Sequence, residues 1–187
     1  MTPMLATSVR VILVLRAFIF FWVTASAFPS AAQVSELDLK AAFLFNFALF
    51  TKPAETAPKA GQSDTDPYRI CIHGKDAMAS SGKILNMRMI AGRTIVVRNT
   101  AAAEELGQCQ LVFMGAMESE STRRALQAVT GLPIITVSDS KEFPAPGMVF
   151  NLVRVGEKIA FQINTQAARN QQLDVSAKLT RLAKDVY

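Results

Sequence analysis

The sequence is poor in histidine and cysteine, two residue types from which catalytic and metal sites are commonly built. It contains one histidine, His73, in 187 residues. A metal site needs several His, Cys or carboxylate ligands at workable spacing. The G-x-S-x-G and H-E-x-x-H motifs are missing, as are the glycine patterns of phosphate- and dinucleotide-binding loops. We therefore expect no enzyme activity, no cofactor and no metal, and we expect His73 to be a core or capped histidine.

A strong charge of one sign is also lacking. The 20 basic and 15 acidic residues give a formal net charge of +5 at pH 7. No basic patch with interleaved aromatic residues is present, which excludes nucleic acid as an expected partner.

The N-terminus carries the first long apolar run. After Arg10, residues 11–27 are interrupted only by Arg16, Thr24 and Ser26, and small residues follow at 25–27 and 30–32. This order is typical of a secretory signal peptide. We predict that residues 1–32 are removed near Ala32 or Ala27. An uncleaved membrane anchor is the alternative, because 17 residues approach the length of a span.

Removal of the leader leaves residues 33–187, enough for one ordinary domain. The mature net charge falls to +3, because Arg10 and Arg16 leave with the leader. The mature part holds two cysteines, Cys71 and Cys109. An even pair in an exported protein predicts a disulfide, with two free buried thiols as the alternative.

The segment Leu39–Thr51, LKAAFLFNFALFT, opens the mature domain. Phe43, Phe47 and Phe50 recur at helical spacing, and Asn46 is the one polar residue between positions 41 and 50. The predicted helix is apolar on nearly every side. Such a helix must be buried in its own domain, in a partner or in a membrane.

The rest of the chain alternates strands and helices, which predicts an α/β fold. We expect a three-layer sandwich: a mostly parallel sheet of about six strands with a C-terminal β-hairpin, and helices on both faces. Residues 53–67 are expected to form a mobile loop within this single domain. Strands are predicted at Tyr68–His73, Arg93–Arg98, Gln110–Met114, Pro133–Val137, Met148–Val155 and Lys158–Ile163. Helices are predicted at Ala77–Met87, Ala101–Leu106, Ser119–Thr130, Thr165–Gln171 and Ser176–Val186.

Ser138 and Asp139 form the most site-like polar pair in the sequence. They follow a predicted strand, and open α/β sheets bind ligands at the carboxyl ends of their strands. Arg181 is a candidate cation for a small anion there. The alternative is an ordinary turn whose side chains satisfy backbone donors.

Three stretches of the chain together resemble the YfiR family of periplasmic proteins. Lys40–Pro53 (KAAFLFNFALFTKP) is similar to the opening signature of that family. Ile135–Val153 (ITVSDSKEFPAPGMVFNLV) is similar to its strand, Ser-Asp corner and Gly-Met-hydrophobic strand. Lys158–Ala183 resembles its closing strand, Ala-rich helix and Ser-x-Lys-Leu-x-x-Leu-Ala end. The likeness spans nearly all of Leu37–Ala183.

The resemblance implies a compact, often dimeric α/β domain in the periplasm that acts by binding. The best-known family members contact the periplasmic sensor domain of a membrane diguanylate cyclase and inhibit it, which lowers cyclic di-GMP and thereby influences biofilm formation. We accordingly predict a negative regulator of an inner-membrane signalling protein. A periplasmic small-molecule sensor, with its ligand near Ser138, Asp139 and Arg181, is the alternative.

Phe43, Phe47 and Phe50 are the predicted partner-binding residues. Desolvated aromatic side chains dominate the energetics of protein–protein interfaces. The competing interpretation is that the same three rings simply pack against the sheet of their own domain.

Overall fold

The computed structural model describes residues 35–57, 65–74, 82–86, 88–115, 119–140 and 146–187. Val34–Tyr187 form one compact unit. The predicted signal peptide and the central part of the predicted mobile loop, residues 58–64, lie outside the described residues. Within the described part of the chain, no helix has the length and apolar character needed to cross a membrane.

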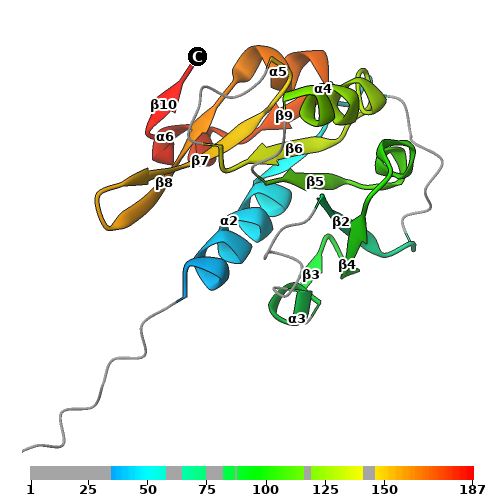
Figure 1. Ribbon diagram of the computed structural model, residues 1–187, viewed down its shortest axis with the longest axis horizontal. Coiled ribbons are helices and arrows are strands. Elements are labelled where there is room, and N and C mark those ends of the chain that lie inside the picture. Colours follow the sequence, from blue (N-terminus) through cyan, green and yellow to red (C-terminus); the bar gives the residue numbers. More distant parts are fainter. Residues whose placement is uncertain (1–34, 58–64, 75–81, 87, 116–118, 141–145) are drawn as a thin grey trace, which may run out of the picture. The chain divides into compact units, whose positions relative to one another are not determined.

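A curled sheet of eight strands forms the middle layer (Figure 1). Its order is β10-β8-β7-β6-β5-β2-β4-β3. The central strands are parallel, and β7 and β8 form the antiparallel hairpin predicted at Gly156-Glu157. The bounds are β2 Tyr68–His73, β3 Met89–Ile90, β4 Arg93–Thr100, β5 Leu111–Met114, β6 Ile135–Ser138, β7 Phe150–Val155, β8 Lys158–Ile163 and β10 Asp185–Val186.

The predicted class is confirmed, and the number of strands is corrected from about six to eight. The two additional strands, β3 and β10, contain two residues each. Strands this short leave no alternation of polar and apolar residues in the sequence. The predicted closing helix, Ser176–Val186, was wrong at its end, because α6 stops at Leu182 and β10 then pairs with β8.

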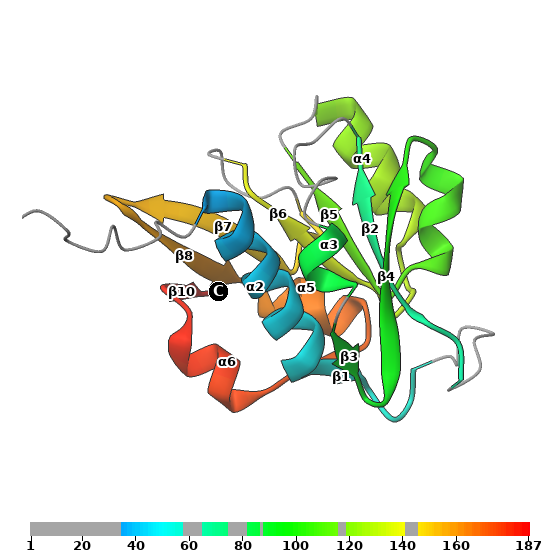
Figure 2. The same cartoon turned by 90° about the horizontal axis from the view of Figure 1, so that it is seen from below.

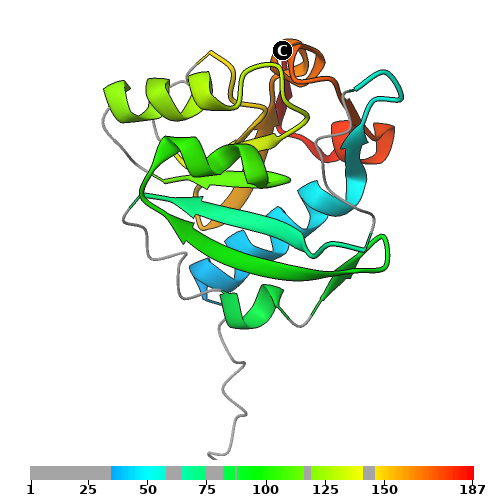
Figure 3. The ribbon, with the colours of Figure 1, turned by 90° about the vertical axis from the view of Figure 1, so that its right-hand side faces the viewer.

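Helices cover both faces of the sheet and enclose two separate cores. Buried residues of α2, α5 and α6 belong to the larger core, and those of η2 and α4 belong to the smaller one. Figure 3 shows α2 on one side of β2, β4 and β5, and η2 and α4 on the other. The bounds are α2 Glu36–Phe50, α3 Gly82–Leu85, η2 Ala103–Gln108, α4 Ser119–Ala128, α5 Thr165–Asn170 and α6 Ala177–Leu182.

A second, two-stranded sheet holds the chain at the end of α2. β1, Thr51–Pro53, continues directly from the helix and pairs antiparallel with β9, Leu173–Val175. The predicted loop therefore begins inside a strand, at Pro53. This small sheet fixes where α2 ends, because the helix cannot continue into a backbone that is extended from Thr51 onward.

The first turn of α2 is capped by Ser35. Its hydroxyl oxygen accepts a hydrogen bond from the backbone N–H of Asp38 at 3.1 Å. Glu36 and Asp38 lie in the same turn, where negative charge favours the helix dipole. The helix is thus specified at both ends while its middle is almost entirely apolar.

Candidate functional site

One side of α2 is part of the core. Ala41, Leu44 and Phe47 are fully buried against the sheet. The ring of Phe47 stacks on Phe150 with centroids 4.1 Å apart, and it meets Phe161 edge-on at 5.1 Å. Stacked and edge-to-face rings at these distances stabilise a core beyond their buried area. This side of α2 therefore fixes the helix on β7 and β8.

The opposite side of α2 carries apolar side chains that the domain does not cover. Leu39 is 36% exposed and Leu49 is 45% exposed. Phe43, Phe45 and Phe50 are half-buried and lie on the same arc of the helix. We call these five residues the α2 surface. Figure 2 shows α2 lying across the outside of the sheet, with α6 on one side and α3 on the other.

Two cations lie over aromatic rings of the α2 surface. The guanidinium of Arg88 is 4.6 Å from the centre of the Phe45 ring, and the ammonium of Lys178 is 4.8 Å from that of Phe50. Both distances fit cation–π attraction. The α2 surface is therefore bordered by two positive charges. Arg88 directly precedes β3, and Lys178 belongs to α6.

Asn46 is the polar residue in the middle of the α2 surface. Its side-chain amide donates to the carbonyl oxygen of Ala42 at 2.9 Å. This bond satisfies one donor within the helix itself. The side chain is half-buried, and none of the described residues donates a hydrogen bond to its carbonyl oxygen, which is an acceptor at the centre of an otherwise apolar area.

The three predicted phenylalanines do not share one environment. Phe47 is 0% exposed, so within the predicted partner-binding set its role would be to support the surface from beneath. Phe43 bridges the two sides, because its ring lies 5.9 Å from Phe47 and 5.7 Å from Phe161 while remaining partly exposed. Phe50 lies on the outer arc under Lys178.

The Ser138–Asp139 corner is satisfied by its own surroundings. The hydroxyl of Ser138 accepts a hydrogen bond from the backbone N–H of Ser140 at 3.0 Å, which is the geometry of an ordinary polar turn. Asp139 pairs with Lys40 at 2.6 Å, and both side chains are only 15% exposed. Lys40 is the cation at this corner, and sequence reasoning missed it because the two residues are far apart in the chain.

Lys40 belongs to a charge network that joins α2 to the sheet. It also pairs with Glu36 at 3.0 Å, and Glu36 in turn pairs with Arg154 of β7. Burial lowers the pKa of Lys40, but its hydrogen bonds to Asp139 and Glu36 outweigh burial, and the pKa lies above its usual value. The same lysine, through its hydrogen bond and charge, holds the pKa of Glu36 below its usual value.

Arg181 is not brought to this corner by any interaction among the described residues. It lies exposed in the last turn of α6. The grouping of Ser138, Asp139 and Arg181 as a ligand site therefore remains a prediction, and the corner already has its cation in Lys40.

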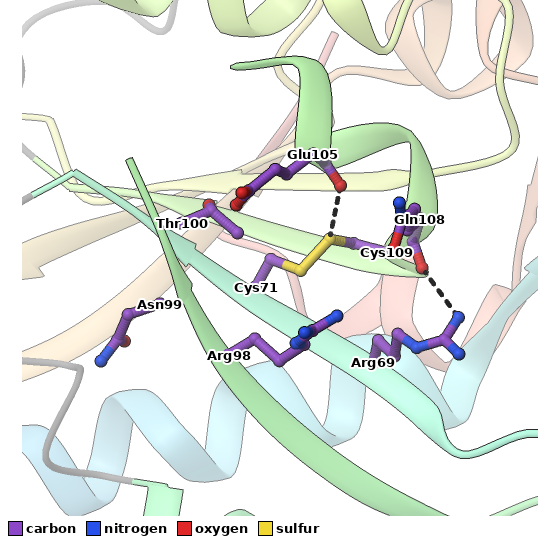
Figure 4. A pocket seen from close by; sticks show the side chains of 8 residues that line it. All are labelled: Arg69, Cys71, Arg98, Asn99, Thr100, Glu105, Gln108 and Cys109. Carbon is purple, nitrogen blue, oxygen red and sulfur yellow. Dashed lines mark hydrogen bonds between the residues drawn. A yellow bond between two sulfur atoms is a disulfide. The ribbon is translucent and has the colours of Figure 1, made fainter. Parts of the chain in front are cut away.

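The predicted disulfide between Cys71 and Cys109 is confirmed. It joins β2 to the residue that follows η2, and both cysteines are buried. A polar cavity of about 340 Å³ lies beside it (Figure 4). Arg69 and Arg98 enter this cavity from the adjacent strands β2 and β4, and Glu105 lies opposite them on η2.

His73 is a buried core histidine, as predicted. Its Nδ1 lies 3.2 Å from the carbonyl oxygen of Thr100, so this nitrogen carries the proton and donates to that oxygen. In the part of the chain that the structure describes, no three His, Cys, Asp or Glu side chains are grouped so that they could hold a metal ion.

The fold and the α2 surface define a class of protein: a three-layer α/β domain whose outer helix presents apolar side chains rather than reactive groups. The family model described as YfiR/HmsC-like matches residues 37–184, and the chain belongs to this family. No curated protein sequence matches the chain. YfiR/HmsC-like proteins are periplasmic, regulatory and non-catalytic, and they act in diguanylate cyclase signalling.

Proposed function

We propose that this protein binds the periplasmic sensor domain of an inner-membrane diguanylate cyclase through the α2 surface and inhibits the enzyme. Cyclic di-GMP synthesis then falls. One observation carries the proposal: α2 keeps exposed or half-exposed apolar side chains over a whole arc of the helix, although it has a core-facing side that anchors it completely.

The chemistry of the α2 surface supports a protein partner. Large contiguous apolar patches are uncommon on monomeric domains and often mark binding surfaces. Phe43 and Phe50 are suited to anchor an interface, because aromatic side chains that become desolvated supply most of the binding energy. Both rings are already held in place by packing, so little side-chain entropy is lost on binding.

The charges around the α2 surface favour a partner with an acidic rim. Arg88 and Lys178 border the aromatic rings, and Lys52 follows at the end of the helix. Complementary charge at the rim of an interface directs orientation and accelerates association. Asn46 adds one hydrogen-bond acceptor at the centre of the surface, which favours one register of the partner over others.

Photo-crosslinking from position 49 tests the identity of the partner. A photoreactive phenylalanine analogue replaces Leu49 in one variant and Val96 in the matched control. Val96 is also exposed but belongs to β4, away from α2. We expect the Leu49 variant, in cells, to crosslink a membrane protein that contains a diguanylate cyclase domain, and the Val96 variant not to do so.

The affinity for the purified sensor domain of that protein is then measured by calorimetry. We expect Leu49→Ser and Phe50→Ser to weaken binding at least tenfold, with the thermal midpoint within a few degrees of the wild type. Val96→Ser should bind like the wild type. Crosslinks only to a second copy of this chain, or α2 variants that bind normally, would contradict the proposal.

A further inference from the structure

The polar cavity beside the disulfide lies on the face of the sheet opposite to α2, and its lining carries charge of both signs (Figure 4). Its volume of about 340 Å³ is in the range of small-molecule sites. One wall is formed by Arg69 of β2 and Arg98 of β4. The opposite wall is formed by η2, which contributes Glu105.

The register of the sheet brings the two arginines together. β2 and β4 are parallel, and Cys71 lies directly across from Arg98. Arg69 is two residues before Cys71, so both arginine side chains leave the same face of the sheet. Neighbouring strands are about 5 Å apart, and like charges at this spacing repel each other. An anion between the two guanidiniums would relieve that repulsion.

The domain itself does not supply this anion. Among the described residues, the side chains of Arg98 and Glu105 make no ion pair and no hydrogen bond. Arg69 makes one long hydrogen bond, in which Nη1 donates to the carbonyl oxygen of Gln108 at 3.4 Å. The arginines and the glutamate therefore face one cavity without pairing with each other, because the gap between the two walls is too wide for direct contact.

The disulfide forms the floor between the two walls. Cys71 is 1% exposed and Cys109 is 3% exposed. The bond carries no charge, so it neutralises neither wall. It also ties the residue after η2 to β2, which fixes the wall that carries Glu105 to the wall that carries the arginines. The two signs of charge are thus held apart before a ligand arrives, and such preorganisation favours binding.

Two cations on one wall and one carboxylate on the other specify a ligand with both charges. We propose that this cavity binds a small zwitterion of the amino-acid type, whose carboxylate and ammonium groups are separated by a few carbon atoms. The carboxylate accepts hydrogen bonds from Arg69 and Arg98, in the paired geometry that guanidinium groups favour. The ammonium group donates to Glu105, and the short carbon chain crosses the disulfide.

Ligands with a single charge fit this cavity less well. A simple anion pairs with the arginines but leaves Glu105 facing negative charge, and a simple cation leaves the arginines facing positive charge. Only a zwitterion pairs all three side chains. The site is on the other face of the sheet from the α2 surface, so this inference does not depend on the proposed function.

Calorimetry and amide NMR on the mature, disulfide-bonded protein test the ligand class. The probes are β-alanine and γ-aminobutyrate, and the matched controls are butyrate, which lacks the ammonium group, and butylamine, which lacks the carboxylate. We expect the zwitterions to bind and to shift the amide resonances of residues 98–100 and 105–109. Butyrate and butylamine should bind about tenfold more weakly or not at all, because each loses a charge-assisted hydrogen bond. No binding of either zwitterion, or equal binding of butyrate, would overturn the proposal.

Variants of the two walls test the assignment of each charge. Arg98→Gln and Glu105→Gln should each weaken γ-aminobutyrate binding about tenfold. Arg181→Gln is the matched control, because Arg181 is also exposed but belongs to α6, and it should bind like the wild type. Glu105→Gln should bind butyrate at least as well as the wild type does, since the repulsive carboxylate is gone. Unchanged γ-aminobutyrate affinity in either wall variant would contradict the proposal.

Discussion

At the scale of single residues, the environment of each α2 side chain decides what its replacement does. Phe47 stacks on Phe150 and has no exposed surface, whereas Leu49 is nearly half exposed. Two apolar residues on one helix thus have opposite roles. Phe47 stabilises the fold, and Leu49 is exposed and can contribute to binding.

Phe47→Ala should lower the free energy of unfolding by about 3–5 kcal/mol, because it removes a fully buried ring and leaves a cavity among the remaining aromatics. Urea unfolding followed by circular dichroism measures this. Leu49→Ala is the matched control on the same helix and should cost less than about 1 kcal/mol. Equal costs for the two variants would contradict the assignment of the two sides of α2.

Thr51→Val should leave the free energy of unfolding unchanged or raise it by up to about 1 kcal/mol. The hydroxyl of Thr51 is buried without a described partner, so its removal relieves a desolvation cost while valine keeps the shape. Thermal unfolding measures this effect. A loss of more than about 1 kcal/mol would mean that the hydroxyl makes a bond that stabilises the domain.

At the scale of elements, the charge network attaches the start of α2 to the sheet. Lys40→Met leaves the largely buried Asp139 unpaired and should cost about 1–3 kcal/mol. The double variant with Asp139→Asn should recover part of this loss. Chemical unfolding of the wild type and the three variants gives the interaction energy, and strict additivity would exclude coupling between the two residues.

The pH dependence of this network follows from its two shifted pKa values. The pKa of Glu36 is lowered, so its contribution is present above its unfolded pKa and is lost as the pH falls through the folded value. The pKa of Lys40 is raised, so its contribution is present below its unfolded pKa and is lost as the pH rises through the folded value. The stability difference between the wild type and Lys40→Met should therefore be constant from about pH 5 to about pH 10 and shrink outside that window. A difference that varies within the window would contradict this assignment.

The disulfide connects β2 with the segment after η2 across 38 residues of sequence. In the chain-entropy model, a loop of this length stabilises the fold by about 4 kcal/mol. Reduction under native conditions should lower the thermal midpoint by roughly 8–16 °C for a domain of this size. Calorimetry with and without reductant measures the shift, and the double Cys→Ser variant should reproduce it. An unchanged midpoint would show that the bond does not restrain the unfolded chain.

Elements with strong periodicity could be predicted from the sequence, and elements made by pairing could not. Runs of apolar residues predict β2, β5 and β6, which are buried. The turn glycine at 156 predicts the β7–β8 hairpin. β1, β9 and β10 have two or three residues each, and only their partners across the fold make them strands. The disulfide was predictable because only two cysteines are available.

The candidate sites were predictable only where they depend on one continuous segment. The apolar character of α2 is visible in its residues, but its division into a core side and an outer side requires the positions of Phe150 and Phe161. Lys40 reaches Asp139, and Arg69 and Arg98 face Glu105 across a cavity, through the folding of distant segments. At the edge of the sheet where we expected a ligand, Asp139 instead pairs with Lys40. The sequence could not predict this pair, because folding brings its two distant segments together.

At the scale of the whole molecule, the residues that hold the fold together differ from those that are exposed for binding. The sheet and the disulfide hold the domain together on one side, and α2 presents the bordered apolar surface on the other. Under the proposed function the domain needs no reactive group, because a binding protein shifts a sensor domain toward the state that it binds.

The cellular content of cyclic di-GMP tests this account most directly. Deletion of the gene should raise cyclic di-GMP, and expression of the wild-type protein or of Val96→Ser should restore it. The folded variants Leu49→Ser and Phe50→Ser, present at equal amounts in the periplasm, should fail to restore it. Full restoration by both α2 variants would contradict the claim that the protein regulates the cyclase through the outer side of α2.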